Sequence, residues 1–577
     1  MIWKFEQRPA AETVAPLVKD LSTSKAFPQV LAELLLRRGI DDYEAAKAYF
    51  APQASELHDP HLMKNLPQAV ERLIQAFRAG EKILLYGDYD VDGTTSVSLM
   101  SLFFEAIELP HEVYIPDRYT EGYGLSYQGV DYAESIGANL MITLDCGIKA
   151  VDKVRYAATK GIEVIICDHH TPGSELPPAL AILDPKQSDC PYPYKELTGC
   201  GVGFKLIQAF SAALNASNLY QAPDPLAEYA DLLALSIACD IVPITGENRT
   251  LAHFGLAKIR NKPLPGIGVL KSQAQSDRHW DISDLVFFIG PRINSAGRLN
   301  HGKDAVKVLR GKSQDLIQLA HELQSANDER KTLDRETTEE ALAQIANSPE
   351  PEAAFSTVLY EPHWHKGIIG IVASRLIETY YRPTVLLTQN DGKLVGSARS
   401  VKGFDLYEAL DLCKEHLIQF GGHKYAAGLT MKPEAFPAFA AHFETVVAER
   451  LTEDQRQPTL AIDAPLSFLD IDARLIRLIQ RMEPFGPANR KPVFATPNVR
   501  VLNSVILKEV HVKLVVESDK RMFEAIGFNL AEKWHRLASN HVHIAYQPDF
   551  NTWNGKTKIN LRLKDLKHPN EAILFPD

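Results

Sequence analysis

Short apolar runs alternate with helical patterns between residue 81 and about residue 310. Three of these runs read KILLYGD, NLMITLDCG and IEVIICDHH, and the helix-like stretches TTSVSLMSLFFEAI and AVDKVRYAATKG follow the first two. Continuous apolar runs are typical of strands that are buried on both faces of a parallel sheet. Their alternation with helices therefore predicts an α/β domain built on a parallel sheet.

The region before this domain and the region after it have helical patterns. Residues 1–80 are mostly helical in pattern, and Gly39 and Gly80 stand where glycine commonly ends a helix. Residues 312–346 contain no Gly or Pro and are rich in charge and in helix formers. They predict one long helix that acts as a solvated spacer between two domains.

From residue 351 the α/β alternation resumes, and from about residue 458 the pattern changes to short strands. The last two strands meet across Asn554 and Gly555, a favoured pair for a tight hairpin turn. We expect these boundaries: an N-terminal helical lead at 1–55, the parallel-sheet domain at 56–310, the connecting helix at 311–348, a smaller α/β domain at 349–452 and a β-rich domain at 453–577.

The composition is that of a soluble globular protein with several domains. The chain has 577 residues, of which 45% are hydrophobic and 23% are charged. No apolar run approaches the roughly 18 residues of a membrane span, and the first residues lack the pattern of a signal peptide. The six cysteines are scattered and form no CxxC pair, which predicts free thiols and a cytoplasmic location.

Charge is distributed unevenly. The chain has a net charge of −11, yet Lys491 to Lys567 contains 13 Lys and Arg against 7 Asp and Glu, or +6, which leaves −17 for the rest. In KTKINLRLK the basic side chains alternate with apolar ones, so that one face carries Lys556, Lys558, Arg562 and Lys564. A solvated outer face also fits this alternation, but the regional charge favours a nucleic-acid-binding module.

The stretch GDYDVDGTTS, residues 87–96, places three carboxylates directly after a buried-strand pattern. A calcium EF-hand loop begins in the same way, but its twelfth position, which must be Glu, is Leu99 here. A phosphate-binding loop would need a GK[ST] lysine, and three carboxylates repel phosphate unless a cation intervenes. The remaining reading is a metal site at the carboxyl end of a strand, where open α/β sheets bind their ligands.

Acidic and imidazole groups end apolar elements three more times. Asp145 ends LMITLD, the run VIICDHH ends in Asp168, His169 and His170, and Asp240 closes an apolar helical pattern. Like charges gathered at one sheet edge require neutralisation, which divalent cations provide. Oxygen-rich sites with few imidazoles suit Mn²⁺ or Mg²⁺ better than Zn²⁺. The carboxylates outnumber what one ion needs, so we expect two ions, which together can catalyse an in-line phosphoryl displacement.

These motifs resemble, in order and spacing, those of the DHH phosphoesterase family, and within it the single-strand-specific RecJ exonucleases. The resemblance covers about residues 60–570. It implies a parallel-sheet DHH domain, a long helix, a smaller α/β DHH-associated domain and an OB-like domain. The segments that carry it are GDYDVDG, LDCG, CDHH, CDIVP, IPDRYTEGYGLS, GPRINSAGR, HWHKGIIGIVASR, GSARS, FGGHKYAAGL and EPFGPANRKPVF.

Carried over residue by residue, the resemblance implies a ligand set for two divalent ions, Mn²⁺ or Mg²⁺. Asp88 would bind a metal or lie beside the ligands, His170 would contact phosphate or tune the metal, and Asp168 would orient a histidine. The implied metal ligands are Asp90, Asp92, Asp145, His169 and Asp240.

The resemblance also implies residues that bind the substrate. His423 would offer its imidazole to a phosphate, and the basic or aromatic groups of Arg292, Arg399, Arg118 and Tyr123 would contact the strand. Taken alone, His423 fits an ordinary turn, and an arginine in a loop is usually solvated. The turn PFGPANR departs from the family pattern PFG-x-GN-P, since Ala488 and Arg490 replace Gly and Pro. We expect this change to alter the local backbone and not the chemistry.

The implied function is a single-stranded-DNA-specific 5′-to-3′ exonuclease that hydrolyses phosphodiesters with two metal ions and acts in DNA repair and recombination. A RecQ-type helicase and a single-strand-binding protein are the implied protein partners. One alternative is a DHH phosphodiesterase or phosphatase acting on short oligonucleotides or nucleotides, which would not need the basic last domain. The other is an inactive DHH replication scaffold, which would be expected to have lost metal ligands.

Overall fold

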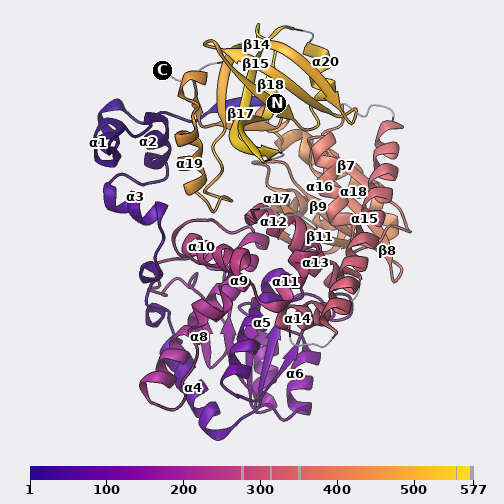
Figure 1. Cartoon of the computed structure of the whole chain (residues 1–577). Helices are drawn as coiled ribbons and strands as arrows, with labels where there is room; N and C mark the ends of the chain where they lie inside the picture. Colours follow the sequence, from indigo (N-terminus) through magenta and orange to yellow (C-terminus); the bar gives the residue numbers. More distant parts are fainter. Residues whose placement is uncertain are drawn as a thin grey trace.

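The computed structural model describes residues 1–274, 279–299, 301–311, 315–348, 353–537, 539–553, 555–571 and 573. Figure 1 shows four parts: a first α/β unit from β2 to α14, the long helix α15, a second α/β unit from β7 to α18, and a barrel unit from β13 to β18. The expected fold class is confirmed: a parallel-sheet domain, a long helix, a second α/β domain and a β-rich domain.

The first unit contains a five-stranded parallel sheet in the order β3-β2-β4-β5-β6. Every residue of β2 and β4 is buried. This explains why these strands appear in the sequence as unbroken apolar runs. The strands are β2 (Ile83–Gly87), β3 (His111–Tyr114), β4 (Leu140–Leu144), β5 (Glu163–Cys167) and β6 (Ala181–Leu183).

Helices cover both faces of this sheet. Leu85 and Ile142 pack with α4, α5, α8 and α9 on one face, whereas Leu84 and Met141 pack with α6 and α7 on the other. The helices are α4 (Leu66–Ala79), α5 (Val91–Ala106), α6 (Tyr127–Ser135), α7 (Val151–Thr159), α8 (Gly199–Ala216), α9 (Pro225–Cys239), α10 (Gly246–Asn261), α11 (Pro265–Ser272), α12 (Ile282–Asp284), a π-helical turn (Leu285–Ile289), α13 (Gly290–Leu299) and α14 (Gly302–Arg310).

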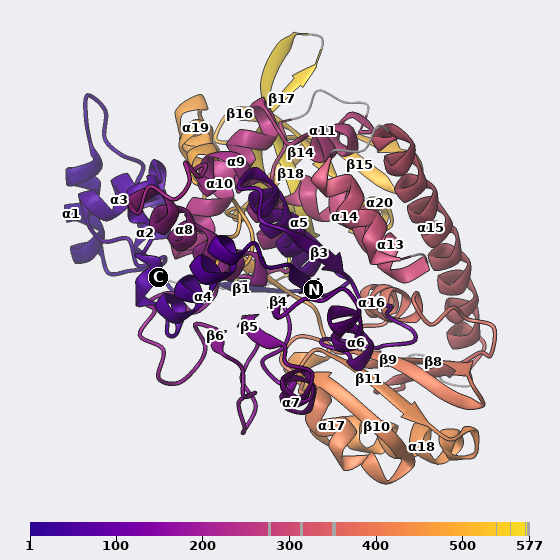
Figure 2. The same ribbon diagram turned by 90° about the horizontal axis from the view of Figure 1, so that it is seen from below.

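Helix α15 (Leu316–Ala346) is the long helix expected from the sequence, but it is not a solvated spacer. Its first half buries Ala320 and Leu323 in the core of the first unit, and its second half buries Ala341 and Ile345 against α16 of the second unit. Figure 2 shows it running along one side of the molecule from one unit to the other. Because one buried face of α15 packs in both cores, this helix fixes the orientation of the two units relative to each other.

The second unit is a five-stranded sheet in the order β10-β11-β9-β8-β7, in which only β7 and β8 are parallel. Its strands are β7 (Thr357–Tyr360), β8 (Thr384–Asn390), β9 (Lys393–Arg399), β10 (Leu417–His423) and β11 (Ala426–Met431), and its helices are α16 (Ile369–Thr379), α17 (Leu406–Leu412) and α18 (Phe436–Arg450).

The barrel unit is closed, because β14 pairs with β17 as well as with β15. The connection between β17 and β18 includes Asn554, so the expected Asn-Gly turn lies partly outside the described residues; Trp553 pairs with Lys556. The elements are β13 (Ala464–Pro465), α19 (Ala473–Arg481), β14 (Phe494–Leu507), β15 (His511–Ser518), β16 (Arg521–Gly527), α20 (Ala531–Leu537), β17 (His541–Trp553) and β18 (Lys556–Lys567).

The N-terminal segment, which lies outside the family resemblance, packs on the barrel unit. Strand β1 (Ile2–Phe5) pairs in parallel with β12 (Thr459–Ile462). Leu17 and Leu31 share one core with barrel residues such as Val512. The segment's helices, α1 (Ala11–Leu21), α2 (Gln29–Leu36) and α3 (Tyr43–Phe50), lie beside α19 in Figure 1.

Two local expectations can be compared directly with the backbone. Gly80 caps α4 with a φ of +62°, as expected, whereas Gly39, also left-handed, lies beyond the last helical residue, Leu36. Ala488 has a φ of +59°, a region that glycine enters at little cost but that strains a residue with a Cβ. The family pattern has glycine there, so the substitution places local strain at the start of the barrel. Within the described residues, no helix combines the length and the apolar character needed to cross a bilayer.

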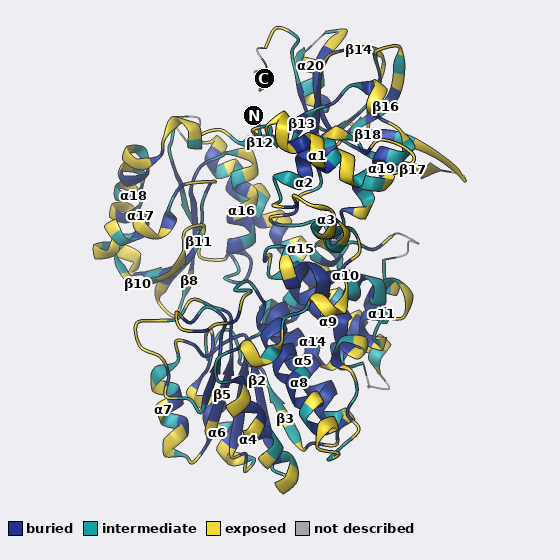
Figure 3. Cartoon of the chain, turned by 90° about the vertical axis from the view of Figure 1, so that its left-hand side faces the viewer, coloured by how far each residue is buried: buried dark blue, intermediate teal, exposed yellow. Residues whose placement is uncertain are grey.

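The second unit contacts the loops at the carboxyl edge of the first sheet. The Tyr119 hydroxyl, in the loop after β3, donates to the Arg298 carbonyl, and Arg298 Nη1 donates to the Gly367 carbonyl at 2.9 Å. Lys366 Nζ lies 4.0 Å from the centre of the Tyr119 ring. Figure 3 shows the second unit and the barrel unit on the same side of the first unit. The edge that carries the acidic motifs is therefore the edge that faces another domain.

Candidate metal centre

The register of the first sheet brings the acidic motifs together. Gly87, Leu144 and Cys167 are the last residues of three neighbouring strands and are paired across the sheet, Gly87 with Leu144 and Leu144 with Cys167. The next residue in each case is an aspartate: Asp88, Asp145 and Asp168. Because parallel strands end at the same edge, the three carboxylates start from adjacent positions.

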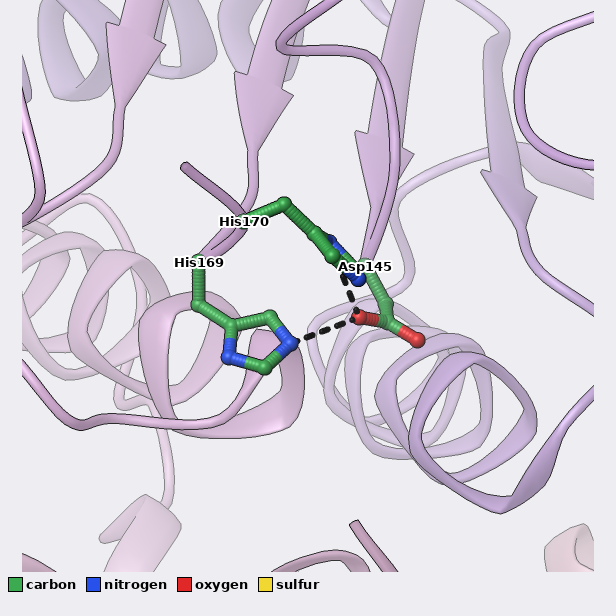
Figure 4. A group of neighbouring side chains, drawn as sticks. All are labelled: Asp145, His169 and His170. Atoms are coloured by element: carbon green, nitrogen blue, oxygen red, sulfur yellow. Dashed lines mark ion pairs between the residues drawn. The ribbon is translucent and has the colours of Figure 1, made fainter. Parts of the chain in front are cut away.

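Distances confirm that distant parts of the chain converge here. His169 Nε2 lies 3.2 Å from Asp145 Oδ1, 3.6 Å from Asp240 Oδ2 and 3.7 Å from Asp92 Oδ2. Asp88, Asp90 and Asp145 also place one oxygen each within 4.8 Å of one another. Figure 4 shows the rings of His169 and His170 directed at the carboxylate of Asp145.

Several polar atoms of this group are buried and have no hydrogen-bond partner among the described residues. They are both carboxylate oxygens of Asp88, Asp145 Oδ1, Asp240 Oδ2 and both ring nitrogens of His169. A buried polar atom without a partner costs about 1–3 kcal/mol, and more if charged. Carboxylate oxygens and an imidazole nitrogen aimed at one space are the donor set of a hard divalent cation. The residues present therefore fit divalent metal ions.

The pKa values of the carboxylates also indicate that this group of acids needs a positive counter-charge. Burial, followed by repulsion from Asp92 and Asp90, raises the pKa of Asp240 to about 9 and holds the pKa of Asp145 well above its usual value. Burial and the neighbouring Asp90 likewise raise the pKa of Asp88. The acids repel one another strongly enough that their ionised forms need a counter-charge.

Asp92 is anchored by elements that the sequence motifs did not identify. Its carboxylate accepts hydrogen bonds from the backbone N–H groups of Gly199 at 2.6 Å and Cys200 at 2.9 Å, at the start of α8, and from the Ser236 hydroxyl at 2.7 Å. A helix N-terminus favours a negative charge in this position. Thr198 caps α8, so the sequence signal was a Thr-Gly pair opening an apolar helix.

Two glycines permit the close packing of this edge. A Cβ at Gly199 would lie 2.6 Å from the Cβ of Asp145, and a Cβ at Gly93 would lie 2.4 Å from the Asp88 carbonyl oxygen. Asp145 itself has a φ of +61°. Only glycine fits at either position, because a Cβ would collide with Asp145 or with the backbone of Asp88.

Asp168 holds His170 in a fixed orientation. Asp168 Oδ1 lies 2.7 Å from His170 Nδ1 and accepts from the backbone N–H groups of His169 and His170, while Oδ2 accepts from Ile148 N–H. Although burial alone would lower it, this contact raises the pKa of His170 to about 9. His170 Nε2 is 2.9 Å from the Tyr123 hydroxyl. The imidazole therefore presents a positive charge beside the carboxylate group.

Arginines gather where the two α/β units meet. Burial and repulsion from Arg118 and Arg399 lower the pKa of Arg298 to about 10, and burial and Arg118 lower that of Arg399. Arg118 also stacks over the Tyr89 ring at 4.9 Å. Two of these arginines, 118 and 399, were expected from the sequence, whereas Arg298 was missed although its motif was recognised.

Arg292, from the same motif, is directed elsewhere. Its guanidinium donates to Gln273 Oε1 at 3.3 Å and to the Phe288 carbonyl, and it stacks on the Phe288 ring at 3.7 Å. Arg292 is 5% exposed. Nε and Nη1 thus already donate within its own domain, and the expected contact of Arg292 with the DNA strand stays a prediction.

The remaining expected substrate contacts lie on two surfaces. His423 is exposed at the end of β10, in the second unit, opposite Ala426 of β11. On β18 of the barrel unit, Lys556, Lys558 and Arg562 are exposed and Lys564 is half-buried.

A hollow of about 660 Å³ separates the barrel unit from the π-helical turn of the first unit. Arg562 and Lys564 line it together with Arg490, Lys491 and Phe287, whereas Lys556 and Lys558 do not. The basic face of β18 is thus divided between the hollow and the outer end of the hairpin.

A parallel sheet whose carboxyl edge collects aspartates and a His-His pair, faced by a second α/β unit, is the architecture of the DHH phosphoesterases. Family models match accordingly: the N-terminal domain of the DHH family at residues 82–237, the DHHA1 domain at 352–449 and the RecJ OB domain at 462–565.

The single-stranded-DNA-specific exonuclease RecJ of Bacillus subtilis is 34% identical over 98% of this chain and 70% of its own length. That of Salmonella typhimurium is 35% identical over 87% of this chain and 90% of its own length. The crystal structure of RecJ in complex with Mn²⁺ from Thermus thermophilus is similar with a TM-score of 0.84 at 28% identity, covering 100% of this chain and 80% of that one. The chain belongs to the RecJ family.

Proposed function

We propose that this protein is a metal-dependent exonuclease that degrades single-stranded DNA from its 5′ end. The observation that carries the proposal is the buried group of unpartnered carboxylate and imidazole atoms at one sheet edge, in a chain whose relatives are named single-stranded-DNA-specific exonucleases. The Mn²⁺ complex of the similar Thermus protein supports divalent ions as the cofactor.

Asp90, Asp92, Asp145, His169 and Asp240, with Asp88 beside them, would hold two divalent ions, Mn²⁺ or Mg²⁺. When bound, such ions activate water and neutralise the phosphate that is attacked. The protein's own part is positioning. Strand ends and the α8 N-terminus fix the carboxylates before substrate arrives, so that little reorganisation is needed during the reaction.

His170 would bind the scissile phosphate. Its imidazole is fixed by Asp168 and carries a positive charge, since the pKa of His170 is raised to about 9. A phosphate oxygen accepting from His170 Nε2–H would displace the contact to Tyr123, whose side chain is 61% exposed and so accessible to a nucleotide. The pair would therefore hold the phosphate beside the residues proposed as metal ligands.

The arginines between the two α/β units support the 5′-to-3′ direction. Burial and the charge of Arg118 lower the pKa of both Arg298 and Arg399, so an anion placed among the three guanidiniums would be bound strongly. A terminal 5′ phosphate carries more charge than a phosphodiester and would relieve this repulsion best. We propose that these guanidiniums bind the end of the strand.

The barrel unit would hold the strand beyond the site of hydrolysis. The hollow beside Phe287 combines an aromatic ring that is 80% exposed with four basic side chains and three aspartates, one of which, Asp549, pairs with Lys491. The ring is suited to a stacked base, and Arg562 and Lys564 are suited to the backbone. A role in DNA repair and recombination, a RecQ-type helicase and a single-strand-binding protein as partners, and a cytoplasmic location follow from the family resemblance and the sequence, and they stay proposals.

Digestion of end-labelled DNA tests the proposal. Single strands and duplexes, labelled at either end, and a dinucleotide are incubated with Mn²⁺, with Mg²⁺ or with chelator. We expect processive loss of the 5′ label from single strands only when an ion is present. Faster hydrolysis of the dinucleotide would favour the small-substrate alternative, and no hydrolysis with either ion would favour the scaffold alternative.

A further inference from the structure

A second group of metal-ligating side chains lies in the second unit, far along the chain from the acidic motifs. Glu415 and His416 belong to the short helical turn Lys414–His416, between α17 and β10, and His442 lies in α18. The proposed function uses none of the three. They belong to elements that pack directly on one another.

The three ligand atoms form a nearly equilateral triangle. His416 Nε2 lies 3.2 Å from His442 Nδ1, and Glu415 Oε1 lies 3.5 Å from each of these nitrogens. In a tetrahedral site with bonds of 2.0–2.2 Å, ligand atoms are about 3.3–3.6 Å apart. The triangle therefore has the size of one face of a tetrahedral coordination sphere.

Hydrogen bonding alone accounts for only part of this arrangement. A bond between the two rings joins one nitrogen of each, and their centroids lie 5.3 Å apart at 89°. The Glu415 carboxylate, at 3.5 Å from both nitrogens, is beyond a normal hydrogen-bond length. A cation at the centre would contact all three atoms at once.

The burial of the side chains defines an open site. The two imidazoles are held against the protein, with 20% and 34% of their side chains exposed, whereas Glu415 is 67% exposed. The fourth position of the tetrahedron would therefore face water. Two imidazoles and one carboxylate favour Zn²⁺ over Mg²⁺ or Mn²⁺, which prefer all-oxygen ligands.

We propose that Glu415, His416 and His442 form a site for Zn²⁺ or a similar transition-metal ion, separate from the metal centre at the sheet edge. Strand β10 starts at the residue after His416 and ends at His423. Metal at this site joins the root of the β10–β11 hairpin to α18, and so steadies the hairpin that carries His423.

The proposal is tested directly by measuring how much zinc the protein retains. The full chain is stripped with chelator, given Zn²⁺ in the presence of excess Mg²⁺ to fill the carboxylate centre, and its zinc content is determined after dialysis. We expect the original chain to retain one more equivalent of zinc than His442→Gln. His321→Gln, which changes an exposed helical histidine outside the triangle, should match the original chain.

Glu415→Gln provides a second comparison in case His442→Gln fails to fold. The Glu415 side chain is largely exposed, so we expect this substitution to leave folding unchanged. It should bind zinc at least tenfold more weakly than the original chain, and zinc should raise the melting temperature of the original chain more than that of this variant. Equal zinc content and equal affinity in the original chain and in Glu415→Gln would overturn the proposal.

Discussion

At the scale of single residues, the metal centre combines strain with close packing. Asp145 lies in the left-handed region, which costs a non-glycine residue roughly 1–2 kcal/mol, and its Cβ leaves room only for a glycine at position 199. Such cost persists where the surroundings force a conformation, and it is common at functional sites. The conformation aims the Asp145 carboxylate at His169.

Asp145→Asn tests the proposed ligand at this scale. The amide keeps the shape but loses the charge, so we expect hydrolysis of single strands to fall at least about a hundredfold while folding and strand binding persist. Rates on an end-labelled strand and circular dichroism would measure both. Asp152→Asn, at an exposed position of α7, is the control; retained activity in Asp145→Asn would remove this residue from the ligand set.

Gly199→Ala tests the packing around that ligand. The added Cβ would meet Asp145 at 2.6 Å, so we expect loss of about 1–3 kcal/mol of stability and a large drop in activity. Gly268→Ala is a matched control in α11, because its Cβ would meet only Pro263 at 3.6 Å. Urea unfolding and activity measurements on the two variants test this prediction. Equal stability and equal activity would show that the sheet edge can relax around the added methyl group at position 199.

At the scale of elements, burial shows which faces of a helix or strand are packed and which are solvated, a distinction that the sequence pattern alone left open. Helix α15 and strand β18 both carry charged and apolar faces, and both patterns also fit a solvated element. The structure shows that α15 buries a stripe in two cores, and that only two of the four β18 cations expected to bind nucleic acid, Arg562 and Lys564, line the hollow beside the first unit. Position along β18 therefore decides which of its cations face the first unit.

The β18 cations allow a comparison within one strand. Replacing Lys556, Lys558, Arg562 and Lys564 with glutamine should weaken binding of long strands and flatten its salt dependence. The pair Arg562 and Lys564 should account for most of the loss, with a slope change of roughly 0.7 per phosphate contact removed. Filter binding at several salt concentrations measures this, with the Lys556 and Lys558 pair as the control. An unaltered slope would contradict a DNA-binding role for this face.

At the scale of the whole molecule, one buried side chain joins three parts of the chain. The Arg249 guanidinium, on α10, donates to the carbonyls of Tyr49 at 2.9 Å, Met482 at 3.0 Å and Glu483 at 2.8 Å. It thereby connects the first unit to the N-terminal helices and to the end of α19. An arginine suits this place because its planar group directs several donors at once.

Arg249→Lys tests whether this junction places the barrel unit. A single ammonium cannot reach all of these carbonyls, so we expect about 1–3 kcal/mol of lost stability at the junction. Digestion of long strands should slow, whereas short oligonucleotides, which reach only the metal centre, should be cleaved normally. Arg155→Lys, half-exposed on α7, serves as the control. Equal slowing on short and long strands would contradict a role in placing the barrel.

The sequence by itself predicted the fold class and the side chains that we propose as metal ligands. Buried parallel strands must be continuously apolar, and ligands must follow their carboxyl ends, so Asp88, Asp145 and His169 could be read from local patterns. Only the tertiary structure decided that Arg298 lies where the two α/β units meet, that Gly199 and Ser236 support Asp92, and that the N-terminal helices cover the barrel. These outcomes depend on contacts between residues far apart in the chain, which leave no periodic trace in the sequence.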